Sequence, residues 1–218
     1  MTNPIVIVGA GGFGRHVLSI LRATRDWNES EFLGFLDDGA VNAERLKGLN
    51  AIHLGPTAML NELPKNTQYV IGIGKGSVRE ALDQIAVQAG LHPLTVIHPD
   101  SSISPDSIVG EGAVICAGAR ITTNVHIGRQ VHLNMNVTVG HDVRLDSFAT
   151  VFPLVALGGE SVIGKRTTIG AGSAINPGIR TGSDSYIASG AVVINDVPEG
   201  VLVAGVPATA KKSASNLT

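Results

Sequence analysis

Residues 115–151 read ICAGARITTNVHIGRQVHLNMNVTVGHDVRLDSFATV, and an aliphatic residue stands at every sixth position of this stretch. The same spacing runs without a gap through seventeen positions, from Ile97 to Val193, and only Thr181 is not aliphatic. Four residues after each of these positions comes a residue that is nearly always small or β-branched. A period of six fits neither an α-helix nor an alternating hairpin, but it is typical of a solenoid in which each hexapeptide forms one short strand and a turn. The repeat therefore predicts a parallel β-helix.

The composition of the chain suits a narrow coil. Aromatic residues make up only 4% of the 218 residues and glycines number 27, so the interior has room for aliphatic side chains but for few rings. The net charge of −2 and the pI near 6.4 give no general attraction to nucleic acid or to an anionic membrane. The lone Cys116 excludes an intramolecular disulfide, and the first residues lack the features of a signal peptide. We therefore expect a cytoplasmic protein with no nucleic-acid or membrane partner.

A different pattern precedes the repeat. An apolar run at residues 5–8 is followed by the glycine loop, Gly9-Ala-Gly11-Gly-Phe-Gly14, and then by apolar residues at helical spacing. Strand, glycine turn and helix in this order are the context in which a G-x-G-x-x-G sequence becomes informative. The alternation continues, and it predicts strands at 32–36, 51–54, 69–73 and 92–99 with helices at 57–63 and 77–89. We predict a small Rossmann-like α/β domain over residues 1–96 and the β-helix over residues 97–218.

Two features of the N-terminal part indicate a nucleotide site. The glycine loop places backbone N–H groups at a helix N-terminus, where they can bind a diphosphate. Asp37 and Asp38 end the second predicted strand, at the position where this kind of sheet contacts a ribose or a base. Each feature has a structural alternative, because the loop could be a tight turn that binds nothing and Asp-Asp-Gly is also an ordinary turn. Their convergence on the carboxyl edge of one sheet favours the nucleotide.

His141 is the candidate general base of the repeat. It occupies a hexapeptide position that neither set of inward residues uses, so its imidazole is expected to project from a corner of the coil. The adjacent Asp142 can orient the ring, and a neutral imidazole suits general-base work at physiological pH; the alternative is a merely solvated histidine. His126 and His132 are six residues apart, so they stack on consecutive faces and form no metal-ligand cluster with the single cysteine. We therefore expect no metal, and Cys116 is a poor candidate for a nucleophile.

These motifs resemble one known family. The unbroken hexapeptides, the internal Gly-His-Asp and the closing Asn195-Asp-Val-Pro198 and Gly205-Val-Pro-Ala208 look like the left-handed parallel β-helix acyltransferases. The glycine loop and Phe35-Leu-Asp-Asp38 make the whole chain similar to the NeuD/PglD-like sugar O- and N-acetyltransferases. The resemblance implies transfer of an acetyl group from acetyl-CoA to a sugar, in a homotrimer whose active sites lie between neighbouring coils.

The resemblance also implies roles for particular residues. His141 would be the general base, Asn134 would help to arrange the site, and the backbone N–H of Gly159 would contact the thioester oxygen. Relatives often carry a second histidine nine residues after the base, where this chain has Thr150. Contacts to a nucleotide-sugar map to Gly11, Gly12, Gly14, Asp37 and Asp38, and the segment beside the coenzyme adenine maps to Gly205, Val206 and Pro207.

The favoured function is acetylation of the amino group of a nucleotide-linked amino sugar, by direct transfer without a covalent enzyme intermediate. O-acetylation of sialic acid is the alternative within the same class. An NAD-dependent oxidoreductase would use the same glycine loop, but it leaves the repeat unexplained. A non-catalytic scaffold would explain the repeat, as would a carbonic anhydrase, although the anhydrase needs three convergent histidines that the spacing does not supply.

Overall fold

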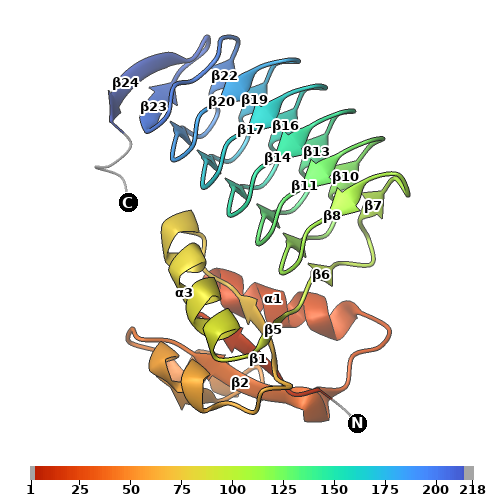
Figure 1. Ribbon diagram of the computed structural model, residues 1–218, viewed down its shortest axis with the longest axis vertical. Helices are drawn as coiled ribbons and strands as arrows, with labels where there is room; N and C mark the ends of the chain where they lie inside the picture. The colour runs from red at the N-terminus through yellow and green to blue at the C-terminus, as the bar shows by residue number, and fades with distance from the viewer. Residues whose placement is uncertain (1–2, 214–218) are drawn as a thin grey trace.

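The computed structural model describes residues 3–213 and shows two parts, an α/β unit followed by a long coil (Figure 1). The N-terminal unit is built on a five-stranded parallel sheet with the strand order β3-β2-β1-β4-β5. Its strands are β1 (Ile5–Val8), β2 (Phe32–Leu36), β3 (His53–Gly55), β4 (Gln68–Ile71) and β5 (His92–Pro93). The predicted Rossmann-like arrangement is confirmed.

Helices cover both faces of this sheet, which is why its central strand β1 is apolar and buried at every position. The helices are α1 (Gly12–Ala23), α2 (Ala43–Lys47) and α3 (Gly76–Gln88), with short 3-10 turns η1 (Glu29–Glu31) and η2 (Thr57–Glu62). Ile5 and Ile7 of β1 pack with α1, whereas Val6 and Val8 pack on the side of η2 and α3. The segment predicted as a helix at 57–63 forms the 3-10 turn η2 instead. Helix α2 was not predicted, although the side chain of Asn42 caps its N-terminus.

The coil is a three-sided prism of stacked hexapeptides, and the predicted left-handed parallel β-helix is confirmed. Each hexapeptide contributes a two-residue strand, and each strand up to β19 pairs in parallel with the strand 18 residues further on, as Ile121 pairs with Val139. The strands are β6 (Val96–Ile97), β7 (Ser102–Ile103), β8 (Ile108–Val109), β9 (Val114–Ile115), β10 (Arg120–Ile121), β11 (His126–Ile127), β12 (His132–Leu133), β13 (Thr138–Val139), β14 (Arg144–Leu145), β15 (Thr150–Val151), β16 (Ala156–Leu157), β17 (Val162–Ile163), β18 (Thr168–Ile169), β19 (Ala174–Ile175), β20 (Arg180–Thr181), β21 (Tyr186–Ile187) and β22 (Val192–Val193).

The three sides of the prism are named here by their strands. The first face begins with β6, β9 and β12, the second with β7, β10 and β13, and the third with β8, β11 and β14. The interior is filled by both sets of periodic residues, so that Leu133 and Val137 are each fully buried. The glycines that follow the aliphatic residues are needed for close approach of successive turns. A Cβ on Gly140 would lie 2.6 Å from the backbone nitrogen of Gly159.

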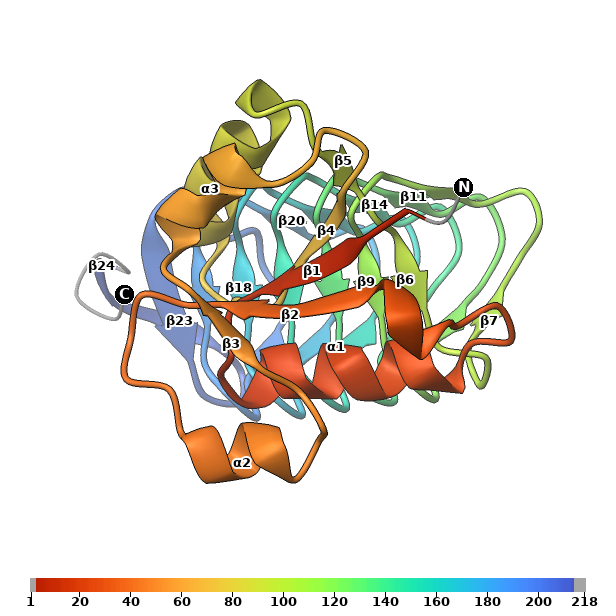
Figure 2. The ribbon, with the colours of Figure 1, turned by 90° about the horizontal axis from the view of Figure 1, so that it is seen from below.

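The N-terminal unit packs on the first face of the coil, where α1 lies alongside it (Figure 2). Val96, Val114 and Cys116 on this face join the apolar core beneath α1. The join itself differs from the single strand that was predicted at 92–99. Leu94 still donates its N–H to the N-terminal sheet, at the carbonyl of Tyr69 (2.9 Å), but Val96 already donates to a coil carbonyl. The segment is thus two short strands, β5 and β6, in two different sheets.

The coil ends in a hairpin that was not predicted. Strand β23 (Val201–Ala204) pairs in parallel with β21 on the first face, and β24 (Thr209–Ser213) returns antiparallel to it. The turn between them contains the cis bond of Val206–Pro207. Across residues 3–213, no helix has both the length and the apolar character needed to cross a membrane.

Candidate active site

His141 lies at the edge of the prism where the second face turns into the third, between β13 and β14. Its side chain is 57% exposed, and its Nδ1 lies 2.7 Å from Oδ2 of Asp142. An ionised carboxylate can only accept, so Nδ1 carries the proton and Nε2 keeps its lone pair when the ring is neutral. The predicted projection of His141 from a corner agrees with this exposure, and the free nitrogen is the one that a base requires.

Asp142 is held in place by the coil. Its backbone adopts a left-handed conformation with φ of 60°, which aspartate tolerates better than most residues. The Asn124 amide, one coil turn earlier, donates to Oδ1 of Asp142 at 2.5 Å. This hydrogen bond, followed by the one from His141, holds the pKa of Asp142 below its ordinary value. The carboxylate therefore stays ionised and can stabilise a protonated imidazole.

Gly159 lies directly against the reactive nitrogen of His141, one coil turn further on. A Cβ on Gly159 would lie 2.5 Å from Nε2 of His141. The two turns are also joined by the N–H of Glu160, which donates to the carbonyl of His141 at 2.8 Å. Only a residue without a side chain leaves this nitrogen accessible, so the backbone of Gly159 and the base face the same space.

Asn134 does not lie beside His141 and Gly159. It follows β12, so it lies at the edge between the first and second faces. Its side chain is nearly buried, and its Nδ2 donates to the carbonyl of Val151 at 3.2 Å. Within one chain, Asn134 and His141 thus occupy different edges of the coil.

The glycines of the N-terminal loop fall into two groups. A Cβ on Gly14 would lie 1.8 Å from the carbonyl oxygen of Gly9, so Gly14 is required for the packing of α1 against β1. A Cβ on Gly11 or Gly12 would meet nothing within 4 Å. These two residues begin α1 and face open space, which is the arrangement that an anion at a helix N-terminus requires.

Asp37 and Asp38 both bind protein backbone. The carboxylate of Asp37 accepts from the N–H of Ala10 in the glycine loop at 2.6 Å and from Gly39 at 2.8 Å. Asp38 accepts from the N–H and the hydroxyl of Thr57, at 2.7 and 2.8 Å, and the backbone bond is the larger cause of its lowered pKa. Asp37 thereby ties the end of β2 to the glycine loop, whereas Asp38 caps η2.

A second glycine-rich loop, which was not among the predicted site residues, lies beside the first. Residues 72–76 (GIGKG) connect β4 to α3. A Cβ on Gly72 would lie 2.4 Å from the Cα of Gly14, so the two loops touch. β2 and β4 lie on opposite sides of β1, and the crevice at such a reversal of strand order is where ligands of open α/β sheets bind. The sequence signal for this loop is the glycine-rich stretch between a strand and a helix at residues 72–76.

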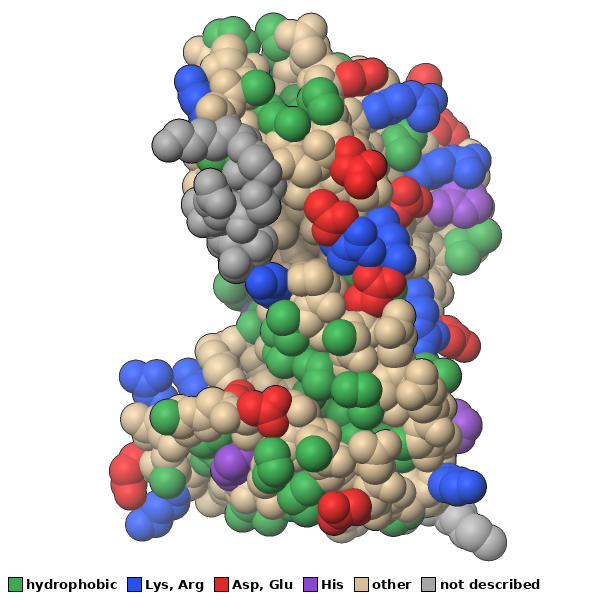
Figure 3. Space-filling view, turned by 60° about the vertical axis from the view of Figure 1, so that its left-hand side comes forward, with side chains coloured by type: hydrophobic (Ala, Val, Ile, Leu, Met, Phe, Trp, Pro, Cys, Tyr) green, Lys and Arg blue, Asp and Glu red, His purple; other side chains and the backbone are tan. Residues whose placement is uncertain are grey.

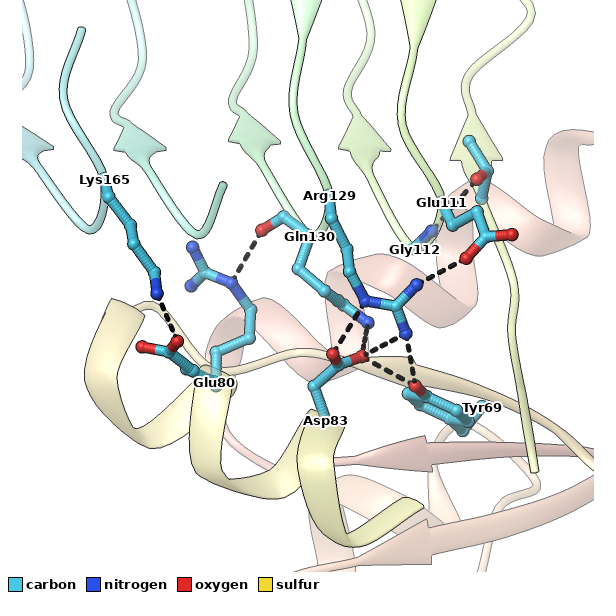
Figure 4. Close-up of polar contacts among 10 residues, drawn as sticks. Tyr69, Glu80, Asp83, Glu111, Gly112, Arg129, Gln130 and Lys165 are labelled. Carbon is cyan, nitrogen blue, oxygen red and sulfur yellow. Dashed lines mark hydrogen bonds and ion pairs between the residues drawn. The ribbon is translucent and has the colours of Figure 1, made fainter. Parts of the chain in front are cut away.

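A polar seam joins α3 to the coil edge between the third and first faces. Asp83 of α3 accepts from the hydroxyl of Tyr69, from the guanidinium of Arg129 and from the amide of Gln130 (Figure 4). Burial, more than the contact with Asp83, raises the pKa of Tyr69, and the hydrogen bond with Asp83 raises that of Arg129. Further along, Glu80 pairs with Lys165 at 2.5 Å. Figure 3 shows acidic and basic side chains gathered on the coil above this join.

His132 and Thr150 lie inside the same interface. His132 is completely buried, and its ring centroid is 4.9 Å from that of Phe13. Burial, followed by the charge of Arg79, holds its pKa well below the ordinary value, so His132 is neutral. Thr150 donates its hydroxyl to the carbonyl of Gly74 at 2.7 Å. Neither side chain is free to contact a substrate.

The remaining candidates lie away from His141. Cys116 is buried, and burial raises the pKa of its thiol to about 12, so it is an inert core residue. Gly205 and Val206 form the hairpin turn beyond β23, and Val206 is 72% exposed. The carbonyl of Gly205 accepts from the N–H of Val192, which places this turn at the end of the second face. Among residues 3–213, we find no group of three or more potential metal ligands.

Comparison with known proteins identifies relatives of both parts. The PglD N-terminal domain family matches residues 4–84, and the hexapeptide repeat of succinyl-transferase matches residues 161–194. The structure is similar to PerB from Caulobacter crescentus in complex with CoA and GDP-perosamine, with 31% sequence identity and a TM-score of 0.86 over 97% of this chain and 99% of that one. It is also similar to the acetyltransferase domain of PglB from Neisseria gonorrhoeae in complex with acetyl coenzyme A, with 30% identity and a TM-score of 0.86 over 97% of this chain and 100% of that one.

Shorter alignments to curated sequences concern the repeat enzymes more widely. One is 48% identical over 50 residues to the 2,3,4,5-tetrahydropyridine-2,6-dicarboxylate N-acetyltransferase of Clostridium perfringens, and it covers 23% of this chain and 21% of that protein. Another is 36% identical over 69 residues to the galactoside O-acetyltransferase of Escherichia coli, and it covers 32% of this chain and 30% of that protein. The chain thus matches less than a third of the length of these two curated relatives. The matches along both parts show that the chain belongs to the NeuD/PglD-like family of left-handed β-helix sugar acetyltransferases.

Proposed function

We propose that this protein transfers the acetyl group of acetyl-CoA to the amino group of a nucleotide-linked amino sugar, with His141 as the general base. The observation that carries the proposal is the exposed imidazole of His141, oriented by Asp142 and facing the backbone of Gly159. The similarity to PerB, whose complex contains CoA and GDP-perosamine, supports this choice of substrates. Residues 1–96 would hold the acceptor, and residues 97–218 would carry out the transfer.

The chemistry requires no covalent enzyme intermediate. The neutral amine attacks the thioester carbon, and Nε2 of His141 accepts the proton that the amine loses. Asp142 stabilises the imidazolium that forms, because its carboxylate is already hydrogen-bonded to Nδ1. The backbone N–H of Gly159 is the proposed donor to the oxyanion of the tetrahedral intermediate. Collapse of that intermediate breaks the carbon–sulfur bond, and the coenzyme leaves as a thiol after it takes up the proton from His141.

Within one chain, the proposed acceptor edge and His141 lie on opposite sides of the coil, and this supports a site shared between copies. The N-terminal unit packs on the first face of the coil, whereas His141 lies at the opposite edge, between the second and third faces. The aliphatic interior of the prism separates the two positions. We therefore propose a homotrimer in which the acceptor held by one chain reaches His141 of a neighbouring chain.

The surface of the coil offers a place for such a neighbour. Three large apolar side chains are exposed at the edge between the first and second faces, where Met135 is 39%, Phe152 38% and Leu154 65% exposed. Exposed apolar clusters of this kind mark protein–protein contacts. Burial of Leu154 and its neighbours against a second coil would remove this surface from water and create a cleft for acetyl-CoA beside it.

The carboxyl edge of the N-terminal sheet is the proposed acceptor site. Gly11 and Gly12 leave the N-terminus of α1 open for a diphosphate, and Asp37 holds this loop through Ala10.

The lone cysteine, Cys116, agrees with a reducing compartment, and we place the activity in the cytoplasm.

An assay of acetyl-CoA consumption tests the proposal. The panel contains UDP-, dTDP-, GDP- and CMP-linked amino sugars, the corresponding hydroxy sugars and free sialic acid. We expect turnover with one class of nucleotide-linked amino sugar and much slower turnover with its hydroxy analogue. Turnover with sialic acid alone would establish the O-acetyltransferase alternative. Tight calorimetric binding of NAD with no binding of any nucleotide-sugar would overturn the acceptor site. Light scattering tests the trimer, and a stable monomer at assay concentration would contradict it.

A further inference from the structure

Arg79, near the start of α3, makes buried polar contacts that join the two parts of the molecule. Its side chain is fully buried. Nε donates to the carbonyl of Gln130 at 2.8 Å, and Nη2 donates to the carbonyls of Phe148 and Ala149 at 2.6 and 3.1 Å. Nη1 donates to the carbonyl of Ile73 at 2.7 Å. One side chain thus binds two successive turns of the coil and the loop that precedes its own helix.

Thr150 completes this contact from the coil. Its hydroxyl donates to the carbonyl of Gly74 at 2.7 Å and accepts from Nη2 of Arg79 at 3.0 Å. Nη1 of Arg79 reaches the same carbonyl of Gly74 at 3.1 Å. The loop of residues 72–76 is therefore tied to the coil through two side chains that also bind each other.

The chemistry of this contact is specific to arginine. Among residues 3–213 no carboxylate accepts from Arg79, and the acceptors are neutral carbonyls and one hydroxyl. Burial lowers the pKa of Arg79 to about 9, and the nearby charge of Asp83 opposes this effect. A planar guanidinium directs its N–H donors to several sides at once, whereas the ammonium of a lysine is a compact group that cannot reach all of these carbonyls.

The loop that Arg79 holds belongs to the proposed acceptor edge. Residues 72–76 touch the glycine loop, because a Cβ on Gly72 would lie 2.4 Å from the Cα of Gly14. A Cβ on Gly76 would lie 2.6 Å from the carbonyl oxygen of Phe148, so the start of α3 also lies directly on the coil. The contacts that set the orientation of the acceptor edge relative to the coil thus lie close to Arg79.

We propose that Arg79 is a positioning residue that fixes the acceptor-binding edge of the N-terminal sheet in one orientation on the coil. The inference rests on the proposed function, because it concerns how the acceptor is presented to His141 of a neighbouring chain. A displacement of about 1 Å in such a presentation can cost on the order of 100-fold in rate. The ion pairs of Glu80 with Lys165 and Arg166 flank the contact, but they are partly exposed and are expected to contribute little.

The test compares the full-length Arg79→Lys and Thr150→Val variants with Lys165→Met, a control that removes a flanking ion pair. Hydrogen exchange of residues 72–76, followed by mass spectrometry, reports on the loop without any substrate. Calorimetry measures binding of CoA and of the nucleotide-sugar that the wild type acetylates fastest, or of UDP and GDP if it acetylates none. Thermal unfolding shows which variants are folded.

In Arg79→Lys we expect exchange in residues 72–76 to become at least about tenfold faster, because the carbonyls that hold the loop lose their donors. Nucleotide-sugar affinity should fall about 10- to 100-fold, the size expected when hydrogen bonds from a charged group are lost, and CoA affinity should not change. Thr150→Val should show a smaller change, and Lys165→Met should show none. If Arg79→Lys does not fold, the exchange in residues 72–76 and the nucleotide affinity of Thr150→Val alone test the proposal. A folded variant with wild-type exchange in residues 72–76 and wild-type nucleotide affinity would overturn the proposal, whatever its melting temperature. Failure of the wild type to acetylate any sugar would instead contradict the proposed function, and the exchange measurement would still decide the role of Arg79.

Discussion

The two histidines His132 and His141 are nine residues apart on the same coil, yet they are placed in opposite environments. His132 is fully buried on the face that the N-terminal unit covers, beneath Phe13 and beside the charge of Arg79. His141 is 57% exposed at the opposite edge, with Asp142 as its partner. Both rings point away from the interior of the coil, but the N-terminal unit covers only the face that carries His132. The packing of the two parts therefore decides which outward side chains remain open for chemistry.

The largest effect that this comparison predicts concerns His141. Replacement His141→Ala should lower kcat by about 10²- to 10⁴-fold, because the amine loses the group that accepts its proton. The melting temperature and the affinity for CoA should stay close to those of the wild type, since the side chain is exposed. Steady-state kinetics and calorimetry measure these quantities, with His126→Ala as the matched control. Near-normal turnover of His141→Ala would move the base elsewhere.

The contact between Gly159 and the imidazole gives the next effect. A methyl group at Gly159 would lie 2.5 Å from Nε2 of His141, so Gly159→Ala should displace the ring and lower kcat by about 10- to 100-fold. The double variant Gly159→Ala with His141→Ala should be no slower than His141→Ala alone, because the displaced group is already absent. Additive losses in this cycle would show that Gly159 acts independently of the base.

On the other side of the molecule, Asp37→Ala should weaken the acceptor site. The carboxylate holds the N–H of Ala10 at 2.6 Å, and its loss should loosen the glycine loop. We expect the KM for the nucleotide-sugar to rise about tenfold, in line with the loss of one hydrogen bond to a charged group. The KM for acetyl-CoA should not change, and Glu44→Ala, which removes an exposed charge on α2, is the control. Equal increases in both KM values would argue against an acceptor-specific role.

The smallest effect concerns acid stability and belongs to His132. Its pKa is lowered in the folded protein, so the unfolded chain binds the proton first as the pH falls below the ordinary value of 6.5. The contribution of His132 to the free energy of unfolding is therefore fully present well above pH 6.5 and is lost below it. The loss amounts to about 1.4 kcal/mol at pH 5.5. His16, whose pKa burial also lowers, acts in the same direction. Urea unfolding at pH 7.5 and 5.5 should show a smaller difference for His132→Leu than for the wild type. An unchanged difference would show that His132 is protonated in the folded state.

Much of the fold could be predicted from local spacing. The period of six placed the strands of the coil, as at Ile121 and Val139, and the order of strand, glycine turn and helix placed β1 and α1. The short helix α2 was missed because its five residues carry too little periodicity to be recognised. The segment from His92 to Pro99 was wrongly predicted as one strand, because nothing local shows that Leu94 and Val96 donate to different sheets.

The architecture of each part and the outward position of His141 beside Asp142 could be predicted without coordinates, because both depend on spacings within a few residues. Only the tertiary structure showed that Asn134 lies at another edge, that His132 and Thr150 are covered, and that Arg79 joins the two parts. The contacts of Arg79 with Phe148 and Thr150 span 69 and 71 residues of sequence. No periodic pattern relates residues so far apart, and their burial follows only from how one domain packs on the other.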